Sequence, residues 1–355
     1  MESILRFKMD FIRYIAMVFI LIFFCFTIFI YFDSMTTYQA PVKILRLERS
    51  STFDLYLKIF NKSYSNEEYQ RRLSNFRESM KEISRLNNET GARHGWTKFT
   101  DMSKEEFSEM LLTPINLDQY KFIYSNCTPN VNKTIIPTDI PEKVDWRTKG
   151  VIGPVVDQLT CGACWAISIV TTMEAMSGIR GLGREQLSIQ ELFDCSTYNK
   201  KCAGGDMSAM DFLCTTEIGI TTEEQYPLTF EENRCDWSKT HSGRRLKEYW
   251  IQRYMNEDDI QRQIAHHGPV IVVVNSSPWQ NYMDGIIQRN CFTSHDGLSL
   301  NHMVQVVGYD KTGAIPYYII KNSWGELFGE KGYVKLAMYK NMCGFSEHVG
   351  YLDVY

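Results

Sequence analysis

Two cysteines lie three residues apart in the stretch QLTCGACWAI, which spans residues 158–167. Such a pair can bind a metal, form a disulfide, carry out redox chemistry or supply a nucleophile. A structural zinc site needs four ligands, usually in two close pairs. Cys161 and Cys164 have no such second pair, because Cys195 and Cys202 are seven residues apart. A redox C-x-x-C motif also needs a strand–helix–strand setting, which the pattern lacks. The sequence therefore favours one structural cysteine and one nucleophile at a helix N-terminus.

A cysteine nucleophile reacts as the thiolate, and the free pKa of about 8.5 is too high for that at neutral pH. The positive end of a helix and a neighbouring imidazolium both lower this pKa. His302 precedes an expected strand and can be the base, while Asn322 follows another strand and can orient the imidazole. Trp324 can shield that pair. Gln158 and the Cys164 backbone N–H can stabilise an oxyanion, so the residues predict acyl transfer.

The elements that would position these residues are of mixed type. A helix is predicted from Cys164, because apolar or small residues recur on one stripe as far as residue 177. Short apolar runs at 270–274, 303–309, 317–320 and 332–337 are separated by turn residues and predict strands. Helices followed by strands favour an α+β fold with two subdomains.

A charge-rich region without cysteine precedes this part, at residues 51–110. Six of its residues keep to one sector of a predicted helix: Glu68, Arg72, Phe76, Ser79, Ile83 and Asn87. Within that helix Glu68 and Arg72 can form an ion pair. Gly95, Thr97, Phe99 and Asp101 alternate as on one face of a strand. Residues 111–139 contain three prolines and are interpreted as a connector, and a new unit begins at residue 140.

The N-terminus carries an uncharged segment, Tyr14 to Phe32, whose 19 residues can just span a bilayer. Three basic residues precede it, so residues 1–13 are expected in the cytosol and the rest in the lumen. We expect a transmembrane signal anchor over 14–32. A long cleaved signal peptide is the main alternative, and a buried core helix is the other.

Composition and charge fit a lumenal protein. The 355 residues are 44% hydrophobic with a net charge of −4, so no nucleic-acid partner is indicated, and ten cysteines suit an oxidising compartment. In the lumen, N-x-S/T triplets can be glycosylated, and the sequence contains five of them. They start at Asn61, Asn88, Asn126, Asn132 and Asn275.

Taken together, the motifs resemble those of papain-family cysteine peptidases of the cathepsin L type, including their inhibitor-type propeptide. The signature C-G-[SA]-C-[WY] is present at residues 161–165, with a histidine and an asparagine far downstream. The helix over 68–87 resembles the propeptide motif E-x3-R-x3-F-x2-N-x3-I-x3-N, with Ser79 replacing an asparagine. The G-x-N-x-F-x-D motif has Thr97 in place of its asparagine. The resemblance covers residues of about 50–355.

The resemblance implies a two-subdomain fold, with a helical subdomain and an antiparallel β-barrel-like subdomain over 140–355, preceded by a helical propeptide. It implies that Cys164 is the nucleophile, His302 the base and acid, Asn322 the orienting residue and Gln158 the oxyanion donor. The expected activity is a thiol endopeptidase that needs no cofactor or metal. Its partners would be peptide or protein substrates, its own propeptide as inhibitor, and the membrane through the N-terminal segment. An acidic endomembrane compartment such as the lysosome is expected, or the extracellular space after release.

The family's disulfides would fall on Cys161–Cys202, Cys195–Cys235 and Cys291–Cys343. Sequence alone cannot prove that connectivity. Three cysteines remain: Cys25 in the membrane segment, Cys127 in the connector, and Cys214, which is interpreted as an unbonded buried residue. The resemblance further predicts cleavage near Thr138–Pro141, which would release a mature enzyme of about 216 residues.

By the same resemblance Gly204 and Gly205 pair with the substrate backbone, and Trp324 borders the site. Four residues should line the pocket for the side chain two before the scissile bond: Met207, Val273, Met303 and His348. Met303 should narrow that pocket. His348 should lie at its floor and change charge between pH 5 and 7, unless it faces solvent.

Leu159 departs from the family pattern, because a glycine usually follows the oxyanion glutamine. If the backbone there needs a positive φ, leucine strains it. A non-catalytic homologue that acts as a binding protein therefore stays open as the alternative function. An exopeptidase of the cathepsin B kind would need a histidine-bearing insertion, which the sequence around His266 and His267 does not contain.

Overall fold

The computed structural model describes residues 52–112, 122–127, 137–240, 243–291 and 300–355. The predicted anchor at 14–32 lies outside these ranges. Within them, no helix combines the length and the apolar character needed to cross a bilayer. Residues 56–355 form one compact unit.

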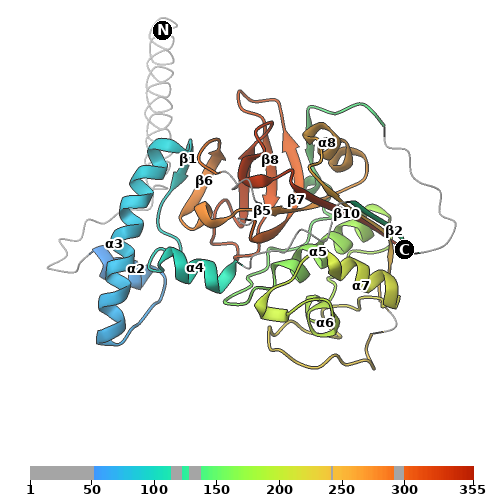
Figure 1. Cartoon of the computed structure of the whole chain (residues 1–355), viewed down its shortest axis with the longest axis horizontal. Coiled ribbons are helices and arrows are strands. Elements are labelled where there is room, and N and C mark those ends of the chain that lie inside the picture. The colour runs from blue at the N-terminus through green and yellow to red at the C-terminus, as the bar shows by residue number, and fades with distance from the viewer. Residues whose placement is uncertain (1–51, 113–121, 128–136, 241–242, 292–299) are drawn as a thin grey trace, which may run out of the picture. The chain divides into compact units, whose positions relative to one another are not determined.

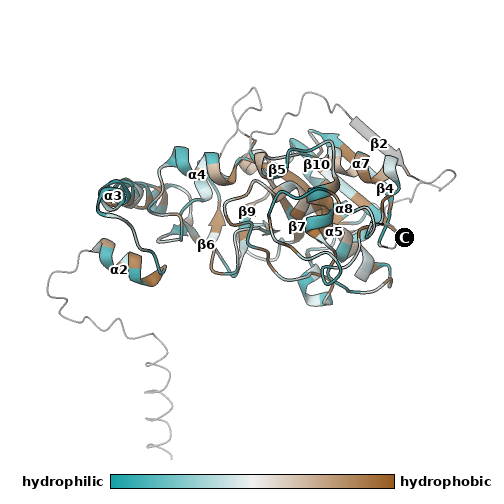
Figure 2. Cartoon of the chain, turned by 90° about the horizontal axis from the view of Figure 1, so that it is seen from below, coloured by the Kyte–Doolittle hydropathy of each residue, from teal (hydrophilic) through white to brown (hydrophobic). Residues whose placement is uncertain are grey.

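Three helices lie in the N-terminal region: α2 (Thr52–Ile59), α3 (Asn66–Glu89) and α4 (Lys104–Leu111). Helix α3 begins where the Ser65 hydroxyl accepts the Glu68 backbone N–H. Helix α4 begins with a capping box between Ser103 and Glu106. The helix predicted over 68–87 is confirmed, and so is its ion pair, since Arg72 Nε lies 2.7 Å from Glu68 Oε1. Helix α3 is largely hydrophilic (Figure 2).

Four further helices follow: α5 (Cys164–Ile179), α6 (Ile189–Cys195), α7 (Ser208–Thr216) and α8 (Glu257–His266). Helix α5 starts at Cys164, as predicted, and its residues 164–177 are all buried. Helices α5, α6 and α7 lie together on one side of the strands (Figure 1). Short 3-10 turns occur at Trp146–Lys149, Lys201–Ala203, Ser277–Trp279 and Met342–Gly344.

The strands are β1 (Ala92–His94), β2 (Phe122–Asn126), β3 (Lys143–Asp145), β4 (Leu246–Arg253), β5 (Val270–Val274), β6 (Tyr282–Ile287), β7 (His302–Asp310), β8 (Tyr317–Lys321), β9 (Tyr333–Ala337) and β10 (His348–Val354). Along the described chain they form one sheet in the order β1-β6-β9-β8-β7-β5-β10-β4-β2, with β3 paired to β7. Only the β6–β9 pairing is parallel among those described. The four predicted apolar strands are confirmed as β5, β7, β8 and β9.

Both edges of this sheet are formed by strands from the region before residue 140. Strand β1 pairs with β6, with an irregular register between Arg93 and His94. Strand β2 pairs with β4 over five consecutive residue pairs. Because β2 lies within the predicted connector, that stretch is not merely a link.

The strand predicted over Gly95–Asp101 is wrong. Only Ala92–His94 is extended, and residues 98–102 form turns. Thr97 explains the difference, because its hydroxyl accepts the Phe99 N–H while its own N–H donates to the Thr100 hydroxyl. Local side-chain to backbone bonds of this kind compete with strand pairing.

Candidate active site

Cys164 is the first residue of α5 and is 1% exposed. The chain before it is fixed by the Cys161–Cys202 disulfide and by the Gly162 N–H, which donates to the Cys202 carbonyl at 3.0 Å. The Cys164 sulfur also lies within hydrogen-bonding range of the Met303 backbone. The nucleophile candidate is therefore placed beside the start of β7, where His302 lies.

His302 is fully buried, and its Nε2 lies 2.7 Å from Asn322 Oδ1. This bond fixes the Nε2–H tautomer, which leaves the lone pair on Nδ1. That Nδ1 is buried without a hydrogen-bond partner among the described residues. The Trp324 ring stacks on the imidazole with centroids 4.9 Å apart, so it shields the His302–Asn322 pair from water.

Gln158 is held from three directions. Its backbone N–H donates to the Ser323 carbonyl at 2.8 Å, and its Oε1 accepts the Ser323 hydroxyl at 2.6 Å. Its Nε2 donates to the Cys161 carbonyl at 2.9 Å. Ser323 was not predicted as a site residue. The signal was available in KNSWG, where a small hydroxyl residue directly follows Asn322.

Leu159 has a φ of 54° and is 57% exposed. The backbone therefore does adopt the left-handed region that favours glycine, at a cost of about 1–2 kcal/mol for an ordinary residue. The Asp157 carboxylate accepts the Leu159 N–H at 3.0 Å, which helps to hold this turn. The predicted strain at Leu159 is confirmed.

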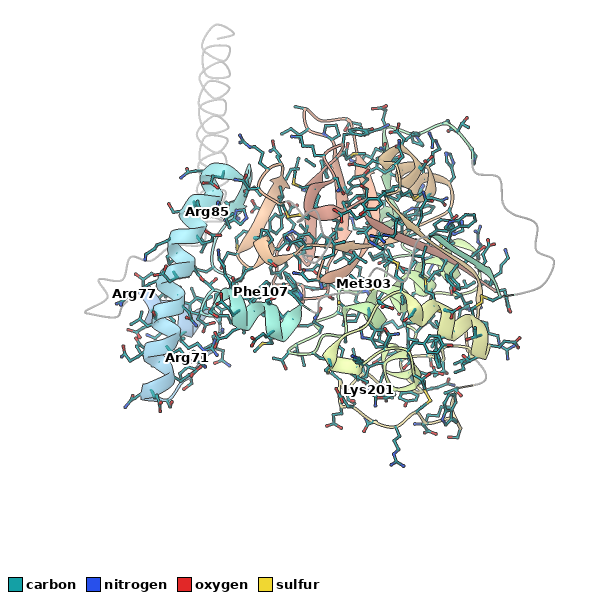
Figure 3. The ribbon with its side chains drawn as sticks, in the orientation of Figure 1. Arg71, Arg77, Arg85, Phe107, Lys201 and Met303 are labelled. Atoms are coloured by element: carbon teal, nitrogen blue, oxygen red, sulfur yellow. A yellow bond between two sulfur atoms is a disulfide. The ribbon has the colours of Figure 1, made fainter. Side chains whose placement is uncertain are left out.

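The region before residue 113 covers the site. The Leu111 carbonyl accepts the remaining bond from Gln158 Nε2, at 3.2 Å. Leu111 and Leu112 are buried, and the Phe107 ring packs edge-on against Trp324 with centroids 5.3 Å apart. Phe107 and Met303 are both labelled in Figure 3. Leu111 and Phe107 were not predicted individually as contacts of the site, because the sequence does not show where the end of α4 lies.

Burial changes the ionisation that was expected for Cys164 and His302. Burial raises the pKa of the Cys164 thiol to about 11, although backbone hydrogen bonds oppose the shift. Burial also lowers the pKa of His302 to about 4, which the bond to Asn322 only partly offsets. The prediction of a low thiol pKa does not hold for this form. Desolvation outweighs the helix terminus, so the covered pair is a neutral thiol and a neutral imidazole.

The predicted substrate-binding residues are buried, except for Gly205, which is half-buried. Met207, Val273 and Met303 belong to one apolar cluster, and Val273 pairs with Met303 between β5 and β7. Gly205 lies so close to the Trp165 ring that an added Cβ would approach a ring atom to 2.7 Å. Gly204 has a φ of 102°, which only glycine adopts readily.

His348 begins β10 opposite Arg253 and is 2% exposed. The alternative in which it faces solvent is therefore wrong. Burial, together with the Arg253 charge, lowers its pKa to about 4. The predicted change of charge between pH 5 and 7 is also wrong, because His348 stays largely neutral over that range.

The structure joins Cys161 to Cys202, Cys195 to Cys235 and Cys291 to Cys343, which are the pairs that the resemblance implies. It also joins Cys127 to Cys214. The interpretation of Cys214 as an unbonded residue is wrong, because strand β2 brings Cys127 to α7. Cys25 lies outside the described residues.

The glycosylation candidates differ in their surroundings. Asn61 and Asn88 are exposed, whereas Asn275 is half-buried and its side chain accepts the Ser277 N–H at 3.1 Å. Asn126 ends strand β2, where its backbone pairs with Glu248. Asn132 lies outside the described residues.

Comparison with known proteins decides the family. Residues 140–352 match the model of the papain family cysteine protease, and residues 53–107 match the cathepsin propeptide inhibitor domain. The chain belongs to the papain family of cysteine proteases. It is 33% identical to human cathepsin O over 295 residues, which is 80% of this chain and 88% of that protein. It is 34% identical to papaya proteinase 4 from Carica papaya over 290 residues, or 80% of each chain.

Solved structures of papain-family precursors have the same fold. A recombinant stem bromelain precursor matches with a TM-score of 0.72 and 28% identity, covering 85% of this chain and 97% of that one. Digestive procathepsin L 3 from Tenebrio molitor larval midgut matches with a TM-score of 0.71 and 28% identity, covering 86% and 100%. The chain is thus a papain-family zymogen, with an α+β fold and a helical propeptide.

Proposed function

We propose that this zymogen matures into a thiol endopeptidase that uses Cys164, His302, Asn322 and Gln158. The observation that carries the proposal is the His302–Asn322 bond of 2.7 Å, which leaves the imidazole Nδ1 free beside the start of α5. A base needs one lone pair free and the other nitrogen fixed.

The reaction follows from these positions. The Cys164 sulfur attacks the substrate carbonyl carbon after His302 Nδ1 takes the thiol proton. Gln158 Nε2 and the Cys164 backbone N–H donate to the oxyanion, and the imidazolium then gives its proton to the leaving amine. A thioester forms, and His302 next deprotonates a water molecule that hydrolyses it. Asn322 keeps the ring oriented through both steps.

The propeptide inhibits by occupying these groups. The Leu111 carbonyl takes the hydrogen bond of Gln158 Nε2 that an oxyanion would need. Burial also keeps both catalytic groups neutral in the zymogen. Removal of the propeptide admits water and substrate, and the desolvation that opposes the thiolate–imidazolium pair is then relieved.

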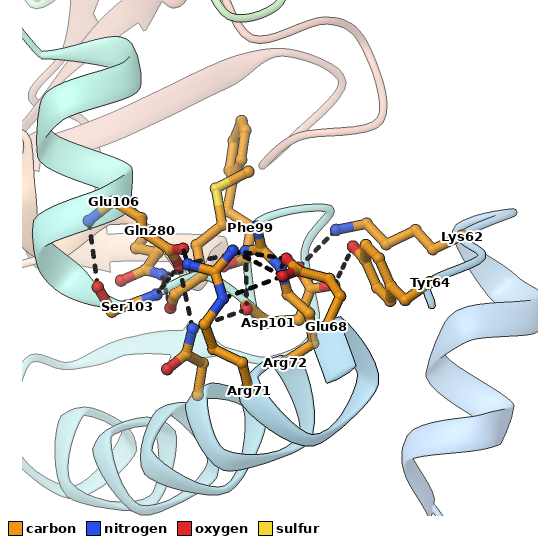
Figure 4. Close-up of polar contacts among 12 residues, drawn as sticks. Lys62, Tyr64, Glu68, Arg71, Arg72, Phe99, Asp101, Ser103, Glu106 and Gln280 are labelled. Atoms are coloured by element: carbon orange, nitrogen blue, oxygen red, sulfur yellow. Dashed lines mark hydrogen bonds and ion pairs between the residues drawn. The ribbon is translucent and has the colours of Figure 1, made fainter. Parts of the chain in front are cut away.

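Maturation would divide the chain into an inhibitory propeptide at 51–110, a connector at 111–139 and a peptidase at 140–355. Cleavage near Thr138–Pro141 is supported by the exposure of residues 137–139. Acid would promote release of the propeptide. Asp101 lies at the centre of the polar contacts within the propeptide, where it accepts the Tyr64 hydroxyl and pairs with Lys62 (Figure 4).

Specificity would be set by Gly204 and Gly205 at the substrate backbone, and by Met207, Val273, Met303 and His348 in the pocket. Because His348 is neutral and buried, we propose that the pocket accepts medium apolar side chains at both pH 5 and pH 7. Human cathepsin O and the cathepsin L-like proteinase of Fasciola hepatica are among the relatives, so the subtype is proposed only as cathepsin-like.

The N-terminal segment over 14–32 would tether the zymogen to an endomembrane with the peptidase in the lumen, and cleavage in the connector would release it. An acidic compartment such as the lysosome suits the cathepsin relatives. Identification of the precursor's N-terminus by mass spectrometry tests the anchor, because a start between Asp33 and Arg46 would show a cleaved signal peptide.

The decisive experiment compares the acid-treated chain with its Cys164→Ala variant on a broad peptide library. Turnover by the wild type and none by the variant is the expected result. Peptide binding without turnover by both proteins would instead support a non-catalytic binding protein. Matched activity of untreated and acid-treated wild type would contradict inhibition by the propeptide.

A further inference from the structure

Strand β2 and Cys127 lie between the two family regions, beyond residue 107 and before residue 140. They are attached to the peptidase in two ways. Strand β2 pairs with β4 from Phe122 opposite Gln252 to Asn126 opposite Glu248. The Cys127 N–H then donates to the Lys247 carbonyl at 3.1 Å, and its sulfur is bonded to Cys214. Strand β2 is labelled at this edge of the sheet in Figure 1.

The elements around this attachment form one packed group. Cys214 lies on α7, and α7 is tied to β4 because the Tyr249 hydroxyl donates to Asp211 at 2.8 Å. Strand β4 is itself paired with β10 on its other side. Without β2, the backbone groups along this side of β4 would form an unpaired edge of the kind that proteins usually cover.

Inhibition is carried by a different stretch of the chain, which precedes β2. The last described residue of the covering stretch is Leu112, which follows the Leu111 carbonyl bonded to Gln158. Strand β2 is held by its backbone pairing with β4 and by the Cys127–Cys214 bond, whereas the bond to Gln158 comes from Leu111. The two duties are therefore separate: one stretch blocks the site and the next completes the sheet.

We propose that Phe122–Cys127 is a permanent part of the mature peptidase, held by the Cys127–Cys214 disulfide after the inhibitory residues have been removed. This inference rests on the proposed maturation of the zymogen. It has a direct consequence for the product. A cut near Thr138–Pro141 cannot by itself release the propeptide, because Cys127 keeps everything before the cut attached. Release requires a cut before Phe122, and the product is then either one chain that begins upstream of β2 or two chains joined by the disulfide.

The test uses the full chain with Cys164→Ala, so that the product does not depend on activity of this protein. The zymogen is treated at acid pH with a catalytic amount of an added papain-family peptidase, alkylated without reduction, and weighed intact before and after reduction. We expect the unreduced product to contain Phe122–Cys127. On reduction it either keeps its mass or loses one peptide that carries Cys127. An unreduced product that lacks these residues would overturn the proposal.

A second measurement reads the bond in the uncut zymogen. After denaturation without reductant, thiol labelling should leave Cys127 and Cys214 unmodified, and modification of both would overturn the proposal. The matched control is the double variant Cys127→Ser and Cys214→Ser in the same background. On prolonged digestion it should lose Phe122–Cys127, whereas the parent retains the segment. Equal retention in both proteins would show that strand pairing alone holds it, and would overturn the role of the disulfide.

Failure of this proposal is distinguishable from failure of the proposed function. If the wild-type chain never cleaves peptides, the Cys164→Ala product still reports whether β2 stays attached. If the wild type is active but its unreduced mature form lacks Cys127, the endopeptidase assignment stands. The proposal that β2 stays in the mature peptidase is then wrong.

Discussion

Strands β1 and β2 form opposite edges of the same sheet, but different interactions hold them there. Strand β1 makes a short, irregular pairing with β6, supported by an Arg93–Asp284 ion pair and by buried His94 against Tyr282. Strand β2 makes a regular pairing with β4 and ends in a disulfide. The first edge contains buried His94, whose protonation would weaken it, so we expect acid to release this edge. The β2 edge does not depend on protonation, so only a reductant or loss of the cysteines can release it.

The largest expected effect weakens the region that carries β1 and leaves the β2 edge intact. Asp101 is fully buried and accepts the Tyr56 hydroxyl at 3.0 Å, the Tyr64 hydroxyl at 2.7 Å and the Lys62 ammonium. Asp101→Ala would leave Lys62 partly buried without its carboxylate, and removal of one partner of a buried pair costs about 3–5 kcal/mol. We expect early digestion of residues 56–112 in the Cys164→Ala zymogen, with Phe122–Cys127 retained. Loss of both regions at the same rate would contradict independent attachment.

Removal of the Cys127–Cys214 bond tests the other edge. The bond closes a separation of 87 residues. Its loss in the Cys127→Ser and Cys214→Ser variant should lower the free energy of unfolding by about 2–4 kcal/mol. Urea unfolding of both zymogens in the Cys164→Ala background measures this. The acid-induced release of residues 56–112 should be unchanged, and a shift in its pH midpoint would show that the edges are coupled.

Protonation of His94 should account for part of the acid sensitivity of the β1 edge. Burial lowers the His94 pKa from 6.5 to about 4 in the zymogen. A lowered pKa means that the stabilisation is complete above about pH 6.5 and is lost as the pH falls towards 4, because the released state takes up the proton first. The expected loss by pH 4.5 is about 2 kcal/mol.

The His94→Phe variant keeps a ring against Tyr282 but cannot take up a proton. In the Cys164→Ala background, its free energy of unfolding should fall less between pH 7 and pH 4.5 than that of the parent. His302 and His348 also have lowered pKa values, but they are present in both proteins and cancel in the difference. Parallel pH curves for the two proteins would remove His94 from the explanation.

The smallest effect is expected at the Arg93–Asp284 pair. Its side chains are 62% and 39% exposed, and exposed pairs contribute about 0–1 kcal/mol. Asp284→Ala should therefore change the unfolding free energy of the zymogen by less than about 1 kcal/mol, and raised salt should hide the difference. A loss comparable to that of Asp101→Ala would mean that the β1 edge depends on surface charge and not on its buried groups.

The sequence determined the parts of this protein that depend on local pattern. Apolar periodicity and flanking turn residues located α3, α5 and the strands β5, β7, β8 and β9, because side chains of such elements must face a core at fixed intervals. The motif around Cys164 with His302 and Asn322 indicated the family. Even the strain at Leu159 followed from residue type, since only glycine takes a positive φ without cost.

Only the tertiary structure decided what depends on contacts between distant residues. The Cys127–Cys214 bond could not be read from the sequence, because spacing does not give connectivity. The pKa values of Cys164 and His302 depend on burial, and burial is a property of the folded chain. The same holds for the turn at residues 98–102, where hydroxyl bonds of Thr97 and Thr100 replaced the strand that the alternating pattern predicted.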